Sequence, residues 1–563
     1  MQCRQCKNQF EHRPEDLLFY KKMDLPPATL CKYCRRQHLL CWRQQRYVYG
    51  RTCDVTGKQI VSTFPPKSDY KVVDRDYWWS DAWNALDYGR DFDFSQPFFP
   101  QFDKLMHEVP MACIFNSKEV NSAYCTYGGE MKNCYLVHAS WAVEDSMYGS
   151  MVISSKDCVD CLQVQKCEGC YECIGCSGCY NTHYSLYSER CIDSLFLASC
   201  YDCINCVGCV NLRKKNHCIL NKQYTKEEYE KKVLALKLDT REGMEAFAKE
   251  FGILRLKEPH KFANLINCED TTGDHVRDLK RCAFSFNGGD NAQDCAYVSN
   301  FLGPMTDVQN GYGVGDGFER GYMIYDTGVK GSDLYFCGTV WGCAYAYYCF
   351  NCHSSFELFG CSGVRNKKYC ILNKEYPKED YLELKKKIIA HMKETGEWGE
   401  YFPPSIAPFG YNTTLSYEYV PLTKEQALAQ GFKWEDALPD TRGKENAQSA
   451  ELGNTIQDVH DDITQKIFAC ADCGKNYKII KQELAFYKKM NIPAPHKCPD
   501  CRYVIRLKKR NPHDLWHRQC MCVRPGHGHH VDGVQCRSEF ETVYAPERKE
   551  TIYCEECYRA EFV

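Results

Sequence analysis

The apolar pattern in the middle of the chain is a short repeat in which cysteine marks the recurring position. The stretches CVNLRKKNHCILNKQYTKEEY (209–229) and CSGVRNKKYCILNKEYPKEDY (361–381) align without a gap, 152 residues apart. Four cysteines match in this register and recur every nine residues: Cys191 with Cys343, Cys200 with Cys352, Cys209 with Cys361, and Cys218 with Cys370. Upstream, Cys134, Cys158 and Cys170 are separated by multiples of twelve. A repeat this short is one strand and a turn, which buries a face only when copies stack.

These repeats predict a mixed α+β fold, mostly β, with a duplicated parallel β-solenoid as its body. We expect solenoid blocks at residues 116–220 and 268–372, each followed by a helix, near 226–237 and 378–394. Thr225 and Glu228 form a capping-box pattern, and Pro377 suits a first helical turn. Helices in these places would cap solenoid ends that otherwise expose unpaired strands.

A second repeat lies at the two ends of the chain. FYKKMDLPPATLCKYCRRQ (19–37) and FYKKMNIPAPHKCPDCRYV (486–504) share an aromatic pair, Lys-Lys-Met, prolines and Cys-x2-Cys. In both copies an earlier Cys-x2-Cys pair stands 24 residues before the second pair. The eight cysteines are Cys3, Cys6, Cys31 and Cys34 in the first copy, and Cys470, Cys473, Cys498 and Cys501 in the second. Two such pairs complete a tetrahedral zinc site.

A bound zinc ion would also explain how a module this small can fold. A module of about 40 residues buries too little apolar surface to fold unaided. A structural zinc ion supplies on the order of 10 kcal/mol of folding free energy. We therefore expect flanking zinc modules at residues 1–50 and 466–515.

At these residues the modules resemble the bacterial "probable zinc-ribbon" domain family, which is treble-clef-like. The family has an aromatic residue four positions after the first cysteine pair, matched by Phe10 and Tyr477. It also has an Arg after the second pair, matched by Arg35 and Arg502. The resemblance implies a structural zinc and little about biological role. The whole chain resembles, more loosely, large cysteine-rich zinc-ribbon proteins of ultra-small candidate-phylum bacteria, a likeness that implies no activity.

The C-terminal segment, 516–563, predicts a third zinc site. Cys554-x2-Cys557 is one ligand pair and Cys536 is a third ligand. The fourth ligand is a histidine, for which we select His530, or one of Cys520 and Cys522. Residues 53–79 repeat this segment with Asp74 and Tyr77 in the places of Cys554 and Cys557. We expect that copy to keep a β-hairpin without metal.

The run Cys167, Cys170, Cys173, Cys176 and Cys179 has two interpretations. Threefold spacing of this kind also holds iron–sulfur clusters in ferredoxin-type sequences. The corresponding positions of the second block include Glu319, Tyr322 and Tyr325, so the backbone path does not require thiols there. The favoured interpretation is therefore a stack of small buried side chains. An iron–sulfur cluster is the alternative.

The remaining segments are assigned by composition. Residues 51–115 hold the metal-free hairpin and an aromatic strap, 77–102, expected to pack on a neighbouring domain. Residues 221–267 are a helical cap, 373–396 a capping helix, and 397–465 an irregular segment with a polar linker at 438–455.

Composition bounds the protein class. The chain has 40 cysteines in 563 residues and a net charge of −3. It begins without a signal-peptide pattern and contains no apolar run long enough to span a membrane, so we expect a cytoplasmic protein with metal-held thiolates and no membrane partner. No GxSxG, HExxH or phosphate-binding loop is present, which favours a non-catalytic role.

Cationic residues gather beside both terminal modules. Residues 31–53 hold six basic and no acidic side chains, and 497–510 hold six basic side chains against Asp500. Arginine paired with phosphate and aromatic rings stacked on bases predict nucleic-acid binding, most plausibly to RNA or the ribosome. The residues expected to carry it are Arg36, Trp42, Arg43, Arg46, Arg506, Lys508, Lys509 and Arg510. Two matched modules would grip two points on one partner. The competing hypothesis is a scaffold that binds protein partners.

Overall fold

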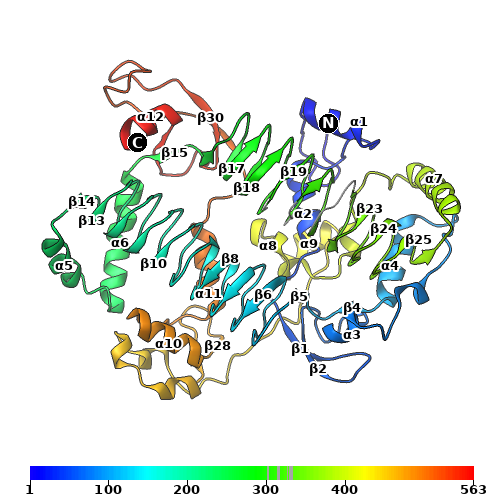
Figure 1. Cartoon of the computed structure of the whole chain (residues 1–563), viewed down its shortest axis with the longest axis horizontal. Helices are drawn as coiled ribbons and strands as arrows, with labels where there is room; N and C mark the ends of the chain where they lie inside the picture. Colours follow the sequence, from blue (N-terminus) through cyan, green and yellow to red (C-terminus); the bar gives the residue numbers. More distant parts are fainter. Residues whose placement is uncertain (301–302, 313–316, 326, 329–333) are drawn as a thin grey trace. The chain divides into compact units, whose positions relative to one another are not determined.

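The computed structural model describes residues 1–300, 303–312, 317–325, 327–328 and 334–563 (Figure 1). The chain divides into two compact units, and each is built from two separated stretches. Unit 1 comprises Met1–Ile114 and Asn264–Leu438, and unit 2 comprises Phe115–Ala263 and Pro439–Val563. Both units combine helices with mainly parallel sheets, so the mixed fold class is confirmed.

The body of unit 2 is a ladder of short parallel strands, here called the unit 2 ladder. Its strands are β5 (Asn116–Ser117), β6 (Gly128–Lys132), β7 (Trp141–Glu144), β8 (Ser150–Lys156), β9 (Leu162–Gln165), β10 (Tyr180–His183), β11 (Ile192–Leu195), β12 (Ile204–Val207) and β13 (Asn216–Ile219). Each strand from β5 to β12 pairs with the segment twelve residues later, as in Tyr180 with Ile192 and Ile192 with Ile204. Single bridges such as Lys156 with Glu168 continue the ladder between β9 and β10. The period of twelve is confirmed.

A finer period of three lies within each twelve. From Lys118 to Leu220, every third residue has a positive φ, close to +50° at Asp193 and Asn205. From Cys125 to Cys209, the residue after each of these left-handed positions is buried. The chain therefore turns a corner every three residues and directs every third side chain inward.

This geometry explains the run from Cys167 to Cys179. All five of its cysteines fall on the inward positions and are buried. The Cys173 thiol donates to the carbonyls of Tyr171 (3.6 Å) and Thr182 (3.1 Å). Ser146 fills an equivalent position and donates to the Glu144 carbonyl at 2.8 Å. Small side chains that satisfy main-chain carbonyls thus fit these positions, as the favoured interpretation requires.

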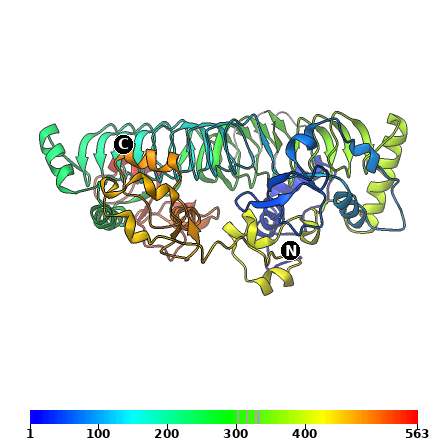
Figure 2. The same ribbon diagram turned by 90° about the horizontal axis from the view of Figure 1, so that it is seen from below.

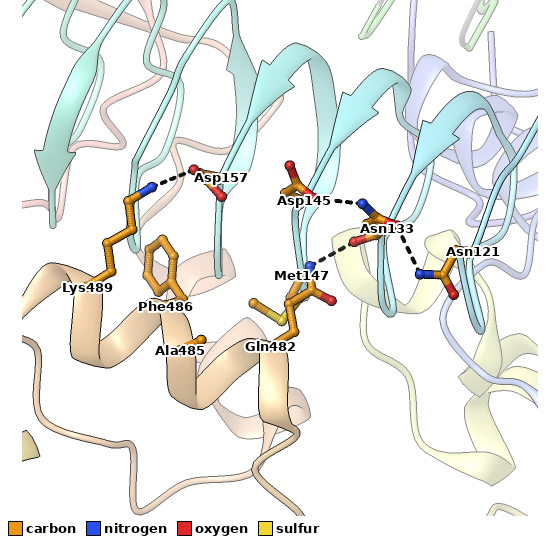
Figure 3. Close-up of a pocket in the computed structure, with 9 residues that line it drawn as sticks. All are labelled: Asn121, Asn133, Asp145, Met147, Asp157, Gln482, Ala485, Phe486 and Lys489. Carbon is orange, nitrogen blue, oxygen red and sulfur yellow. Dashed lines mark hydrogen bonds and ion pairs between the residues drawn. The ribbon is translucent and has the colours of Figure 1, made fainter.

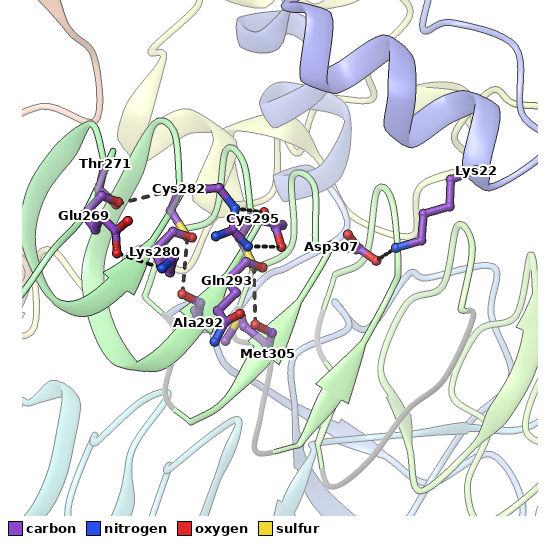
Figure 4. Close-up of polar contacts among 12 residues, drawn as sticks. Lys22, Glu269, Thr271, Lys280, Cys282, Ala292, Gln293, Cys295, Met305 and Asp307 are labelled. Carbon is purple, nitrogen blue, oxygen red and sulfur yellow. Dashed lines mark hydrogen bonds and ion pairs between the residues drawn. The ribbon is translucent and has the colours of Figure 1, made fainter.

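The unit 1 ladder has less regular spacing. Its strands are β16 (Leu265–Ile266), β17 (Gly273–Lys280), β18 (Ser285–Gln293), β19 (Met305–Thr306), β20 (Phe318–Glu319), β21 (Thr327–Gly328), β22 (Val340–Trp341), β23 (Ala344–Tyr347), β24 (Phe356–Phe359) and β25 (Lys368–Ile371). Partners are thirteen residues apart at Met305 and Phe318 but twelve apart at Phe356 and Lys368. Figure 4 shows thiols of the first part, where Cys282 donates to the Ala292 carbonyl at 3.5 Å.

Helices follow both ladders where the sequence predicts them. The last strands form hairpins with β14 (Lys222–Gln223) and β26 (Lys374–Glu375), and α5 (Lys226–Ala235) and α7 (Lys378–Glu394) come next. Thr225 and Glu228 make both hydrogen bonds of a capping box. A further helix, α6 (Arg241–Lys257), packs Phe247 and Phe251 against Phe196 of the unit 2 ladder.

The aromatic strap packs within unit 1. It begins within α3 (Arg75–Trp79) and ends within α4 (Phe98–Glu108). Trp78 is buried edge-on to His353 and lies 5.1 Å from the Arg365 guanidinium. Phe98 packs on Tyr348 and Phe359 of the unit 1 ladder. The strap therefore covers the ladder, as expected from its aromatic density.

The remaining elements belong to the small modules and connections. The terminal modules contain α1 (Pro14–Lys22), α2 (Lys32–Leu40), β27 (Phe468–Ala469), β28 (Asn476–Tyr477), α10 (Lys481–Met490) and α11 (Pro499–Lys509). The two hairpin segments contain β1 (Tyr49–Thr52), β2 (Gln59–Ser62), β3 (Val72–Val73), β4 (Met111–Ala112), β29 (Trp516–Gln519), β30 (Glu539–Thr542), β31 (Ile552–Tyr553) and α12 (Glu555–Phe562). Strand β15 (His260–Lys261) follows α6 and pairs with β31. The connections contain α8 (Leu415–Tyr419), α9 (Lys424–Ala429) and the 3₁₀ turns η1 (Ala85–Tyr88), η2 (Pro404–Ile406), η3 (Tyr411–Thr413), η4 (Ser449–Leu452), η5 (Ile456–Asp458) and η6 (Asp461–Gln465). Every helix in the described ranges is too short or too polar to span a bilayer.

Candidate metal centres

The predicted cysteines of both terminal modules converge. In each module the four sulfur atoms lie within 4.8 Å of one another. Cys6 and Cys31 are 3.8 Å apart, and Cys473 and Cys498 are 3.7 Å apart. A tetrahedral ion with metal–sulfur bonds of about 2.3 Å requires sulfur separations of about 3.8 Å. All eight predicted ligands are therefore placed to hold two metal ions.

The local backbone places hydrogen-bond donors and helix N-termini beside these sulfur atoms. The second pair in each module opens a helix, with Cys31 before α2 and Cys498 before α11. The amide of Cys31 donates to Cys3 Sγ (3.3 Å), and the amide of Cys498 donates to Cys470 Sγ (3.2 Å). Amide donors and helix N-termini stabilise thiolates.

The pKa shifts agree with this picture. A hydrogen bond with the Cys34 side chain is the main cause that lowers the pKa of Cys31 to about 5. Burial acts to raise the pKa of Cys470, but amide donors led by that of Cys498 outweigh it and lower the pKa to about 7. Each module thus holds a thiol that ionises readily, as a metal ligand must.

A third four-cysteine group lies at the C-terminus, formed by Cys520, Cys536, Cys554 and Cys557. The sulfurs of Cys520 and Cys557 are 3.7 Å apart, and those of Cys536 and Cys554 are 3.9 Å apart. The Cys554 amide donates to Cys520 Sγ at 3.2 Å, which repeats the contact of the terminal modules. Cys520 therefore completes this group, whereas the predicted His530 lies in a different group.

The hairpin at residues 49–79 has the same framework with other residues. Strands β1 and β2 pair antiparallel as β29 and β30 do. Cys53 Sγ accepts from the amides of Asp74 (3.2 Å) and Thr56 (3.3 Å). Thr56, Asp74 and Tyr77 thus take the places of Cys536, Cys554 and Cys557, and the expected β-hairpin is present.

The terminal repeat (residues 19–37 and 486–504) packs each terminal module against a ladder. In unit 2, Arg502 donates to the Tyr487 hydroxyl (2.7 Å) and pairs with Glu483 (3.2 Å). Tyr148 of the ladder donates to Glu483 at 2.7 Å, and the Tyr171 ring packs on Tyr487. All five of these side chains are buried where α10 and α11 meet the ladder. Figure 2 shows the backbone of this module, in orange, beside the ladder.

Unit 1 repeats this arrangement with equivalent residues. Arg35 donates to the Tyr20 hydroxyl at 2.6 Å, and the Tyr20 ring meets Tyr322 of the unit 1 ladder edge-on. Tyr297 of the same ladder donates to Asp16 at 2.7 Å. Asp16, Tyr20 and Arg35 stand 467 positions before Glu483, Tyr487 and Arg502. Asp16 and Glu483 were not singled out from the sequence, although this constant offset marks them.

Docking also buries part of the predicted nucleic-acid surface. Trp42 and Arg506 are 0% exposed and Arg43 is 3% exposed. A fully enclosed side chain cannot stack on a base or reach a phosphate, so these three are removed from the candidate interface. Arg36, Arg46 and Arg510 are half-buried, and Lys508 and Lys509 are exposed.

A groove of about 390 Å³ runs where α10 meets the unit 2 ladder (Figure 3). Asn121, Asn133 and Asp145 form a row of hydrogen bonds along it, at 2.9 and 3.0 Å. Gln482 of α10 donates to the Asn133 carbonyl, and Lys489 pairs with Asp157 at 2.7 Å. These groups satisfy one another, so the groove is explained as the docking seam.

No family model matches the chain, and no curated protein matches it. Among solved structures, a chain described as an acetyltransferase from Desulfovibrio desulfuricans G20 shares 10% identity, covering 50% of this chain and 82% of that chain, with a TM-score of 0.11. At that TM-score the likeness carries no argument. The assignment of function therefore depends on the geometry of the described residues.

Proposed function

We propose that this protein is a non-catalytic, zinc-stabilised cytoplasmic scaffold whose two ladders are β-solenoid blocks that bind another protein. The observation that supports this proposal most directly is the burial of the arginine that follows the last cysteine of each terminal module. Arg35 and Arg502, which follow the last ligand of each terminal module, are buried against ladder tyrosines. The modules therefore serve to cover and brace the ladders, and the uncovered ladder surface is left for a partner.

Zinc is the metal that these sites suit best. Four cysteine sulfurs at tetrahedral spacing make a closed, thiolate-only site, which is typical of structural zinc. Such a site leaves no open position for a substrate or water. A structural role for the ions agrees with a non-catalytic protein.

One row of the unit 2 ladder supports a protein partner. Tyr180, Ile192 and Ile204 lie in register on β10, β11 and β12 and are 49%, 37% and 43% exposed. The same row continues as exposed charges of alternating sign, at Lys132, Glu144, Lys156 and Glu168. An apolar stripe bordered by exposed charged side chains is the usual anatomy of a protein interface.

Site-specific photo-crosslinking in native cells tests this stripe. A benzoylphenylalanine at position 192 is expected to capture a discrete protein partner. Val120 begins the same row and is 62% exposed, so a benzoylphenylalanine there is the matched control. Equal capture from both positions, or capture of RNA alone, would contradict the scaffold proposal.

Elemental analysis tests the zinc sites. We expect at least three zinc ions per reduced chain, and one fewer after Cys31→Ser. Cys173→Ser, on an inward position of the ladder, should leave the zinc content unchanged because serine already fills such positions. A wild-type chain that folds without zinc would refute the structural role of the metal.

RNA binding is the second candidate. Lys508 and Lys509 remain exposed on the last turn of α11 and keep a cationic surface beside the second module. If RNA binds there, retention should fall steeply with salt and should weaken in a Lys508→Ala, Lys509→Ala double variant. Unaltered retention would exclude that surface.

A further inference from the structure

The C-terminal hairpin carries an insertion that its N-terminal counterpart lacks. Cys53 and Thr56 are separated by two residues, whereas the equivalent Cys520 and Cys536 are separated by fifteen. The strands on either side pair in the same way in both hairpins. The insertion adds potential metal ligands that the four-cysteine group does not use: Cys522, His527, His529 and His530.

His529 directs Nε2 at the four-cysteine group, 3.1 Å from Cys557 Sγ and 3.6 Å from Cys536 Sγ. The other three potential ligands form a second group with Cys557. The side chains of Cys522, His527 and His530 lie with Cys557 so that their ligand atoms are all within 4.8 Å of one another. Cys522 is buried, and both histidines are half-buried. Cys557 therefore belongs to two four-ligand groups at once, because it is also a member of the four-cysteine group.

The histidine rings are held as metal-binding histidines usually are. His527 directs Nδ1 at Cys522 Sγ (3.2 Å), and its Nε2 lies 3.5 Å from the Glu561 carboxylate. His530 has Nδ1 3.1 Å from the Val531 carbonyl, while its Nε2 is buried without a hydrogen-bond partner. An oxygen acceptor on one ring nitrogen fixes the tautomer and leaves the other nitrogen free to bind a metal. The orphaned Nε2 of His530 is the atom that a metal ion would satisfy.

We propose that the C-terminal module binds two zinc ions, with the Cys557 thiolate as a bridge between them. One ion takes Cys520, Cys536, Cys554 and Cys557, and the second takes Cys522, His527, His530 and Cys557. The second ion also compensates charge, since a zinc ion with four thiolates carries a net charge of about −2. Adding a dication and one more thiolate reduces this to about −1.

The proposal rests on the zinc sites of the proposed function, and metal counting separates the two. Native mass spectrometry of the zinc-loaded full chain should find four ions. A His527→Gln, His530→Gln double variant should hold three. His517→Gln is the matched control, because His517 is an exposed histidine of the same module that contacts Glu539 and Glu541. That variant should keep four.

Three ions in the wild-type chain, or an unchanged count in the double variant, would overturn the second site. If Cys536→Ser still lowers a wild-type count of three, the four-cysteine site stands and only the bridged pair fails. If the module holds no metal at all, both proposals fail there.

Cobalt substitution supplies a readout that does not depend on counting. Two cobalt(II) ions bridged by one thiolate are magnetically coupled, so the wild-type chain should show less electron paramagnetic resonance signal per cobalt than isolated sites give. The double variant should recover the full signal per cobalt. Full intensity in the wild-type chain would contradict a bridging Cys557 even if four ions are bound.

Discussion

At the scale of single residues, the buried charges around Asp160 decide how the second module is held. Asp160 is 0% exposed and pairs with Arg506 at 2.8 Å and Arg502 at 3.1 Å. The sequence showed Arg506 as one of several cations near a metal site and gave no sign of its partner, which lies far away on the ladder. A buried cation needs such a partner, because removing one member leaves an uncompensated charge in a dry site.

Asp160→Asn should therefore destabilise unit 2 by about 3–5 kcal/mol. Asp202→Asn is the matched control, because Asp202 also lies on the ladder in a left-handed conformation and pairs with Arg190 at 2.6 Å. That pair is largely exposed, so its loss should cost less than about 1 kcal/mol. Pulse proteolysis in urea measures both values on the full chain. Similar costs for the two variants would contradict a buried charge network.

At the scale of elements, the period of twelve was readable along the repeats, whereas the period of three showed only in the run from Cys167 to Cys179 and was not recognised as a backbone period. Cysteines spaced by nine and twelve reveal the stacking, because inward positions repeat in every layer. The left-handed corners are harder to recognise, since they hold Tyr148, Phe196 and Leu136 as well as asparagine and aspartate. Contacts between stacked layers outweigh the steric cost of a positive φ for large residues. The residue types at the corners are therefore only a weak indication of this backbone conformation.

Asn205 tests that corner geometry, with φ of +51° on β12. Asn205→Val should destabilise unit 2 by about 1–2 kcal/mol, because a β-branched residue is strained in the left-handed region. Asn205→Gly should stay within about 0.5 kcal/mol, since glycine adopts this conformation without strain. Urea unfolding of both variants gives the comparison. A valine variant as stable as the glycine variant would show that the corner does not require this backbone.

At the scale of the whole molecule, the terminal repeat makes contacts within the protein. The sequence predicted that the two modules grip an outside partner. In the structure, the terminal repeat instead packs each module against a ladder. Tyr297 is 281 residues from Asp16, and Glu483 is 335 residues from Tyr148. Pairings this distant leave no local pattern, so the metal ligands could be predicted from spacing while the choice of ladder could not.

Because each module braces the ladder of its own unit, loss of one metal site should loosen that unit first. In a Cys470→Ser, Cys473→Ser variant, hydrogen exchange should quicken in α10, α11 and the segments around Tyr148 and Tyr171. In a Cys3→Ser, Cys6→Ser variant, it should quicken in α1, α2 and the segments around Tyr297 and Tyr322.

Each variant serves as the control for the other, because both remove one cysteine pair from a matched site. The docking clusters are the physical reason for a local response: an unfolded module withdraws the arginine and the acid that its ladder tyrosines contact. Faster exchange across both ladders in either variant would show that the units do not respond separately. Unchanged exchange at the four tyrosine segments would show that the modules do not brace the ladders at all.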